Sequence, residues 1–240
     1  MARRGRLIAI EGRSAAGKTT LVRAAASELR WQPLREAFDR LDPAPSLEYG
    51  SPRELLRLEG ILLSEEVRRY REARALCQQG HTVLADTGFL GPLLYTHGLV
   101  ALGRAPASVG RAVERSTRSL VRRGALGLPD LTVYLETTAR ERARHARADA
   151  TRHPAPLVGR HEAVGAVEQR FFEELFPMAL PDRFRSLRAR SGPPGPVLTL
   201  RALVAEADPA PASKTEGLAL VSLLRLPVRD GRRSNVGPNR

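Results

Sequence analysis

Hydrophobic and polar residues follow two different patterns along this chain. Short apolar runs that end at glycine or aspartate predict buried strands, and longer stretches with apolar residues three or four apart predict helices. The expected strands are Leu7–Gly12, a short one within Trp31–Phe38, His81–Asp86, Leu131–Leu135 and Val197–Leu200.

Helices are expected between these strands. The longest has the clearest start, because Ser51 can cap it, Pro52 suits its first turn and Glu54 can close a capping box. Gly80 is typical of a residue just past a helix end. The expected helices cover Gly17–Arg30, a stretch from Ser51 to Gln79, Pro92–Leu102, Pro106–Arg123, 138–149 and Glu162–Phe176, with a break at Leu157–Gly159 and an end at Pro177.

Strands that alternate with helices predict an α/β fold. The expected architecture is a three-layer sandwich, in which a parallel sheet of about five strands carries helices on both faces. We assign residues 1–207 to this single domain. Residues 208–240 contain prolines and a basic end, and we expect them to form a disordered tail.

A phosphate-binding motif follows the first expected strand. The stretch Gly12–Thr19, GRSAAGKT, fits G-x-x-x-x-G-K-[ST], the P-loop of the P-loop NTPases. It lies directly after a strand and directly before a helix, where loop amides can surround an anion. The expected ATP-binding residues are Gly12, Arg13, Ser14, Ala15, Ala16, Gly17, Lys18, Thr19 and Thr20. Lys18 would reach the outer phosphates, and the Thr19 hydroxyl would bind Mg²⁺.

The composition singles out the lysine of this motif. Lysine and arginine together number 39, and only Lys18 and Lys214 are lysines. A chain that uses arginine for nearly every cation keeps lysine where a compact ammonium is needed beside phosphates.

The net charge of +13 raises the question of a nucleic-acid partner. The arginines are spread over the whole chain, and aromatic residues make up only 5% of it, too few for stacking platforms. Nucleic acid is therefore an unfavoured partner, and anionic nucleotides explain the charge equally well. No apolar run approaches the ~20 residues that cross a bilayer. A single cysteine and the lack of a signal-like segment give a cytoplasmic location as the expectation.

The stretch IEGRSAAGKTTL resembles the start of the deoxyribonucleoside kinases and thymidylate kinases. The resemblance extends more weakly over residues 6–200 and implies a kinase that often dimerises. It implies that Glu36, after the second strand, acts as base on the acceptor hydroxyl, which must be held and lose a proton. It also implies a metal or substrate role for Asp86 at a strand end. The following residue is Thr87, where the family carries an arginine that holds the substrate's reacting end.

The same resemblance implies a lid at 138–160 that closes over ATP. Lid arginines would stabilise charge that develops during transfer. Arg140, Arg142, Arg144 and Arg147 compete for this role, and we select Arg144 and Arg147 as the catalytic pair.

These observations predict a magnesium- and ATP-dependent kinase that phosphorylates a small molecule. The catalytic set is Lys18, Glu36, Asp86, Arg144 and Arg147, and the metal would be held by Thr19 and Asp86. The acceptor would be a nucleoside, a nucleotide or a similar compound. Two alternatives stay open: a phosphotransferase for an antibiotic or secondary metabolite, and an NTP-hydrolysing switch associated with DNA.

Overall fold

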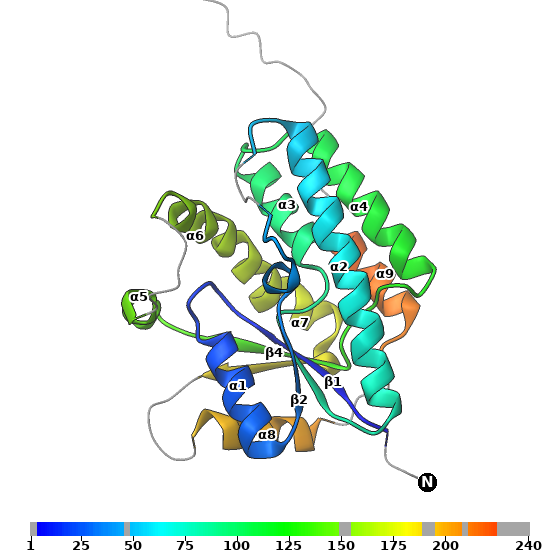
Figure 1. Cartoon of the computed structure of the whole chain (residues 1–240), viewed down its shortest axis with the longest axis vertical. Coiled ribbons are helices and arrows are strands. Elements are labelled where there is room, and N and C mark those ends of the chain that lie inside the picture. Colours follow the sequence, from blue (N-terminus) through cyan, green and yellow to red (C-terminus); the bar gives the residue numbers. More distant parts are fainter. Residues whose placement is uncertain (1–3, 46–48, 149–154, 189–194, 208–210, 225–240) are drawn as a thin grey trace, which may run out of the picture.

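The fold is built on one parallel sheet of five strands (Figure 1). The computed structural model describes residues 4–45, 49–148, 155–188, 195–207 and 211–224, with the side chains of 155–162 left out. The strands are β1 (Leu7–Glu11), β2 (Gln32–Leu34), β3 (Val83–Asp86), β4 (Leu131–Glu136) and β5 (Phe184–Arg188), in the spatial order β2-β3-β1-β4-β5. All four strand pairings are parallel. The predicted parallel sheet of five strands is therefore confirmed.

Helices cover both faces of the sheet. One face carries α1 (Lys18–Leu29) and α8 (Pro196–Glu206), and the larger layer lies on the other face (Figure 1). The elements of this larger part are α2 (Pro52–Gln78), α3 (Gly91–Ala101), α4 (Ala107–Arg122), α6 (Ala155–Arg170), α7 (Phe176–Ala179) and α9 (Lys214–Leu223), with short turns at Phe38–Arg40, Phe171–Leu175 and Pro181–Arg183. Helix α5 (Ala139–Ala148) lies apart from this layer, beyond the end of β4 (Figure 1).

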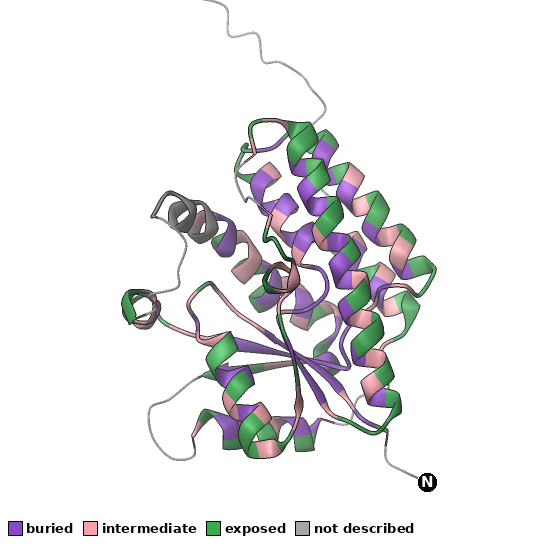
Figure 2. Ribbon diagram, in the orientation of Figure 1, coloured by how far each residue is buried: buried purple, intermediate pink, exposed green. Residues whose placement is uncertain are grey.

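Alternation along β1 divides the core into two layers. Leu7 and Ala9 face the larger helical layer, whereas Ile8 and Ile10 face α1 and α8. All four side chains are fully buried, and the strands form a continuous buried centre in Figure 2. A short apolar run without polar interruption is what a strand covered on both sides requires.

The start of α2 forms as predicted, with one difference in its cap. The Glu54 amide donates to Ser51 Oγ at 3.2 Å, but the Glu54 carboxylate accepts from the Gly50 amide instead of the Ser51 amide. The helix ends before Gly80, whose φ of 92° is the left-handed conformation that glycine adopts without strain.

The expected strand at Val197–Leu200 is wrong, because these residues begin α8. Val197, Leu200 and Val204 are all buried, at spacings of three and four that place them on one face of a helix. The last strand is instead β5, Phe184–Arg188, which pairs only with β4 and so forms an edge of the sheet. Edge strands tolerate exposed charged residues, which is why its polar sequence gave no strand signal.

The expected helix break at Leu157–Gly159 is also wrong. Helix α6 runs through it, since one glycine costs a helix only about 1 kcal/mol. Pro177 does not end the helical segment either. A π-helical turn at Phe171–Leu175 precedes α7, and Pro177 lies in the first turn of α7, where a missing amide hydrogen is tolerated.

The expected tail from residue 208 contains an ordered helix, so this part of the prediction is wrong. Helix α9 carries a capping box formed by Ser213 and Glu216. Leu220 and Val221 are fully buried against the core. The Glu216 carboxylate also accepts from Arg183 Nε at 2.7 Å, which anchors α9 beside the start of β5. Residues 208–210 and 225–240 lie outside the described residues.

Removing α9 is therefore expected to destabilise the domain. A chain that ends at residue 210 should lose about 2–3 kcal/mol, because several buried apolar side chains leave the core while the freed segment regains conformational entropy. Thermal unfolding monitored by circular dichroism would measure the loss. A chain that ends at residue 224 keeps α9 and is the matched control. Equal melting temperatures for the two truncations would contradict this role of α9.

The described residues hold no helix that combines the length and apolar character that crossing a bilayer requires.

Candidate active site

The P-loop lies at the point in the sheet where the strand order reverses. From β1 the chain first builds β2 and β3 on one side and then β4 and β5 on the other. Ligands of open α/β sheets bind at this switch point, beyond the carboxyl ends of the strands. Gly12 has φ 145°, Ala15 has φ 61° and Gly17 has φ 99°, so the loop alternates its amide directions before α1 begins at Lys18. Such a loop and helix N-terminus can surround an anion.

Lys18 lies inside this loop. Its Nζ donates to the Gly12 carbonyl oxygen at 2.9 Å and to the Arg13 carbonyl oxygen at 3.4 Å. The side chain is half-buried. The ammonium is therefore held at the mouth of the loop by carbonyls that a phosphate oxygen can replace.

Thr19 and Asp86 are brought together from the two sides of the switch point. Thr19 Oγ1 donates to Asp86 Oδ2 at 2.5 Å. Asp86 is only 3% exposed, and among the described residues its Oδ1 has no hydrogen-bond partner. A buried carboxylate oxygen without a donor costs free energy unless a ligand satisfies it. The described ranges contain no group of three or more His, Cys, Asp or Glu side chains placed to hold a metal.

The turn after β3 is held by a buried arginine from α2. Thr87 has φ 66°, which is strained for a β-branched residue. Arg69 is fully buried, and its Nη2 donates to the carbonyl oxygens of Asp86 at 2.9 Å and Thr87 at 3.2 Å. Arg69 also pairs with Glu66 and donates from Nε to the Arg35 carbonyl oxygen at 2.7 Å. A guanidinium thus reaches the turn from another element, although position 87 carries none.

Glu11 fixes the same turn from β1. Its Oε1 accepts from the Gly88 amide at 2.7 Å. Burial raises the pKa of Glu11 to about 8, against the lowering effects of this hydrogen bond and of Lys18. A side chain at position 88 would meet the Glu11 carboxylate, since a Cβ there would lie 2.7 Å from Oε1. A larger residue at this position would therefore have to displace the Glu11 carboxylate from its hydrogen bond with the turn.

Two further glutamates, Glu36 and Glu168, interact electrostatically with Lys18. Burial raises the pKa of Glu36, and the Asp86 carboxylate raises it further while Lys18 lowers it. Burial likewise raises the pKa of Glu168 on α6, and Lys18 again opposes the shift. Both side chains are half-buried. The structure therefore brings Lys18, Glu36 and Asp86 of the predicted set to one region, and adds Glu168.

Helix α5, which falls in the expected lid, contacts the P-loop through a residue that the sequence analysis did not select. His145 on α5 places Nδ1 3.0 Å from the Ala15 carbonyl oxygen. Arg144 and Arg147 are exposed, and the Nε of Arg147 donates to Ala143 of its own helix. Arg142 is buried instead and donates to the Thr137 carbonyl oxygen. The catalytic roles of Arg144 and Arg147 stay predictions, and residues 149–154 of the expected lid lie outside the described residues.

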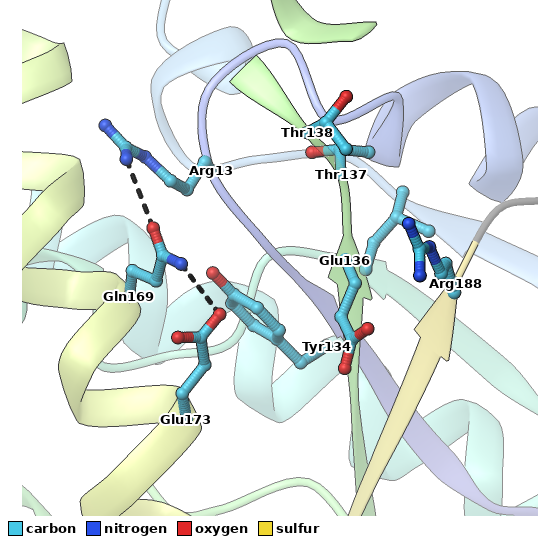
Figure 3. Close-up of a pocket in the computed structure, with 9 residues that line it drawn as sticks. Arg13, Tyr134, Glu136, Thr137, Thr138, Gln169, Glu173 and Arg188 are labelled. Carbon is cyan, nitrogen blue, oxygen red and sulfur yellow. Dashed lines mark hydrogen bonds between the residues drawn. The ribbon is translucent and has the colours of Figure 1, made fainter. Parts of the chain in front are cut away.

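A small cavity opens beside Arg13, at the carboxyl ends of β4 and β5 (Figure 3). Arg13 Nη1 donates to Gln169, and Gln169 donates to Glu173, so the three side chains form a chain along one wall. Arg188 lies on the opposite side, across Tyr134. The cavity has a volume of about 200 Å³, which is smaller than the ~300 Å³ at which ligand pockets usually begin. It would therefore hold only part of a ligand.

Sequence reasoning missed three contributors to the site. Arg69 lies on the apolar face of α2, and a charged residue at a core position is the signal that could have found it. Glu11 lies in the stretch IEGRSAAGKTTL, but the resemblance that this stretch carries implied no role for it. His145 offered no signal, because its contact depends on how α5 packs.

Comparison with known proteins agrees with the fold. No protein-family model matches the sequence, and no curated protein matches it significantly. Among solved structures, deoxyadenosine kinase from M. mycoides with bound dATP has a TM-score of 0.60 and 16% identity, covering 83% of this chain and 97% of that chain. The same kinase with the products dCMP and dCDP has a TM-score of 0.59 and 13% identity, covering 83% of this chain and 98% of that chain. Thymidylate kinase from Candida albicans has a TM-score of 0.60 and 16% identity, covering 88% of this chain and 96% of that chain. These likenesses confirm the fold and its resemblance to nucleoside and nucleotide kinases.

Proposed function

We propose that this protein is an ATP-dependent kinase that transfers a phosphoryl group to a small molecule of the nucleoside or nucleotide type. The observation that carries the proposal is the joining of the P-loop to a strand-end carboxylate, through the 2.5 Å hydrogen bond between Thr19 and Asp86. Phosphoryl transfer needs mainly positioning and charge neutralisation. The loop would position the phosphates, and Lys18 together with a metal ion at Thr19 and Asp86 would neutralise their charge.

The donor set fits Mg²⁺. A threonine hydroxyl and a carboxylate are hard oxygen ligands, and Asp86 Oδ1 is buried without a partner among the described residues. Mg²⁺ in such sites takes one or two protein ligands and completes its shell with phosphate oxygens and water. Thr19 and Asp86 would hold the ion, which neutralises charge on the phosphates when bound. Lys18 would leave its carbonyl partners and bind the outer phosphates.

Glu36 would orient the acceptor hydroxyl and accept its proton. Burial raises the pKa of Glu36. A carboxylate with a raised pKa is a stronger base than an exposed glutamate, and is therefore better suited to hold a proton during transfer. Glu36 follows β2, and the Asp86 carboxylate contributes to its raised pKa, so the base and the expected metal ligand would border the same acceptor.

Replacing Asp86 with asparagine is expected to lower phosphoryl transfer by about a hundredfold, because removing a ligand charge weakens the metal contact. The assay would supply ATP, Mg²⁺ and a panel of nucleosides and nucleoside monophosphates to the full chain. Product mass and ADP release would be measured together. Chelation of Mg²⁺ should abolish transfer, and added Mg²⁺ should restore it.

Asp182→Asn is the matched control, since Asp182 is an exposed aspartate in the turn before β5. Full activity of Asp86→Asn would remove the proposed metal role. Hydrolysis of ATP that needs no acceptor and rises with added DNA would favour the switch instead of the kinase.

A further inference from the structure

The P-loop holds one residue in a conformation that its own side chain disfavours. Ala15 has φ 61°, in the left-handed region, where a Cβ lies too close to the following carbonyl group. Gly12 and Gly17 also have positive φ values, but they carry no Cβ. A strained conformation of this kind persists where neighbouring groups hold it in place.

The group that holds Ala15 from outside the loop is His145 of α5. Its Nδ1 lies 3.0 Å from the Ala15 carbonyl oxygen. A carbonyl oxygen only accepts hydrogen bonds, so Nδ1 carries the proton and donates it. The same ring covers Gly17, because a Cβ on Gly17 would lie 4.0 Å from Nδ1 and Cε1. A helix that lies apart from the main helical layer thus packs one side chain on the loop (Figure 1).

The same turn of the loop is held from a second helix. The Ala16 amide donates to the Arg13 carbonyl oxygen at 3.0 Å, which closes a turn of the chain. Arg13 Nη1 donates to Gln169 of α6 at 3.1 Å. The turn is therefore held at Arg13 by α6 and at Ala15 by α5.

The bond from His145 fixes the direction of one peptide plane. In a trans peptide the carbonyl and the following amide point in opposite directions. While the Ala15 carbonyl points to α5, the Ala16 amide points to the Arg13 carbonyl oxygen, which also lies 3.4 Å from Lys18 Nζ. A flipped peptide would turn its carbonyl oxygen toward this inner side of the loop. The oxygen would there repel the phosphates that the loop amides attract.

We propose that His145 is a positioning residue for the polyphosphate of ATP, and that its hydrogen bond to Ala15 holds the P-loop in the binding conformation before the ligand arrives. This inference rests on the proposed kinase function and names a residue that supports its phosphate site. His145 acts by preorganisation, which raises affinity because less of the loop must be ordered on binding. It does so without touching the nucleotide.

The binding test compares three substitutions of His145 by calorimetry, with magnesium ATP and with magnesium tripolyphosphate at physiological salt. His145→Ala should weaken the binding of both ligands by about five- to tenfold, the effect of one lost hydrogen bond. His145→Asn should bind nearly as the original chain does, because an asparagine amide can place an N–H donor where Nδ1 lies. His145→Gln carries its amide farther from the backbone and should bind as weakly as His145→Ala. His81→Ala, at an exposed histidine outside the loop, is the control and should leave binding unchanged.

The kinetic test separates positioning from a merely structural role. The KM for ATP should rise in His145→Ala by the same factor as the Kd. The kcat at saturating ATP should stay within about twofold, because the hydrogen bond is present equally before and during transfer. A merely structural role would lower the melting temperature, measured by circular dichroism, without separating asparagine from glutamine.

Two binding results would overturn the inference. Equal affinities of His145→Asn and His145→Gln would mean that the Nδ1 hydrogen bond has no part in binding. A loss with ATP that tripolyphosphate does not share would mean that His145 acts on the adenosine instead of the phosphate loop. Weakened binding in His145→Ala without transfer to any acceptor by the original chain would reject the kinase function and keep this role. Transfer by the original chain, with unchanged ATP binding in His145→Ala, would do the reverse.

Discussion

Replacing Lys18 with arginine is expected to lower phosphoryl transfer by about a hundred- to a thousandfold, although the charge stays the same. Loss of one preorganised contact to transition-state charge has an effect of this size. The Lys18 ammonium lies 2.9 Å from the Gly12 carbonyl oxygen, within the curve of the loop. A guanidinium is broader and planar, so it would press on the loop instead of reaching the phosphates. Initial rates of ADP formation with a saturating acceptor would measure the loss.

The chain provides a matched control for this substitution. Lys214 is the other lysine of the sequence, and it is exposed at the start of α9. Lys214→Arg makes the same chemical change away from the P-loop and should leave transfer unchanged. Turnover of Lys18→Arg close to that of Lys214→Arg would mean that the loop accepts any cation. The presence of lysine instead of arginine in the motif would then have no chemical explanation.

The central elements of the fold were predictable because their signals are local. The strand before the P-loop is covered on both faces, so it is apolar throughout, and the motif after it fixes which edge of the sheet binds phosphate. The C-terminal part of the fold was not predictable, because its local sequence patterns suit more than one structure and the surrounding core decides between them. The apolar run at Val197–Leu200 suits a strand or a buried helix equally, and only the spacing to Val204 separates them. Helix α9 is short, and most of its stability comes from the core that it covers.

The candidate site divides in the same way. The positions of Lys18, Thr19 and Asp86 follow from a motif and a strand end. The contact of His145 with Ala15 joins residues 130 positions apart, and no local pattern encodes such a contact. The support of the turn at Thr87 comes from Arg69, also distant in sequence. The family resemblance implied a cation at the turn after β3, where this chain carries Thr87. The sequence did not reveal that α2 would supply it through Arg69.

Replacing Arg69 with methionine is expected to destabilise the protein by about 3–5 kcal/mol, because removal of one partner leaves a buried charge uncompensated. Glu66 is 2% exposed, and burial raises its pKa to about 7 even with Arg69 beside it. The carbonyl oxygens of Asp86 and Thr87 would also lose their donor. Denaturant unfolding would measure the free energy, and transfer at a temperature where the variant is folded would measure the effect on the turn.

Two companion variants distinguish the buried charge from the support of the turn. Arg68→Met changes the neighbouring arginine, whose side chain is 74% exposed, and should alter stability by less than about 0.5 kcal/mol. The double variant Arg69→Met with Glu66→Leu should recover part of the stability, since the unpaired carboxylate is removed. It should not recover transfer, because Thr87 in its strained conformation still lacks the guanidinium that holds it. Recovery of both together would show that Arg69 serves only to neutralise Glu66, and the turn after β3 would then hold its shape through Glu11 and the Ile10 carbonyl oxygen alone.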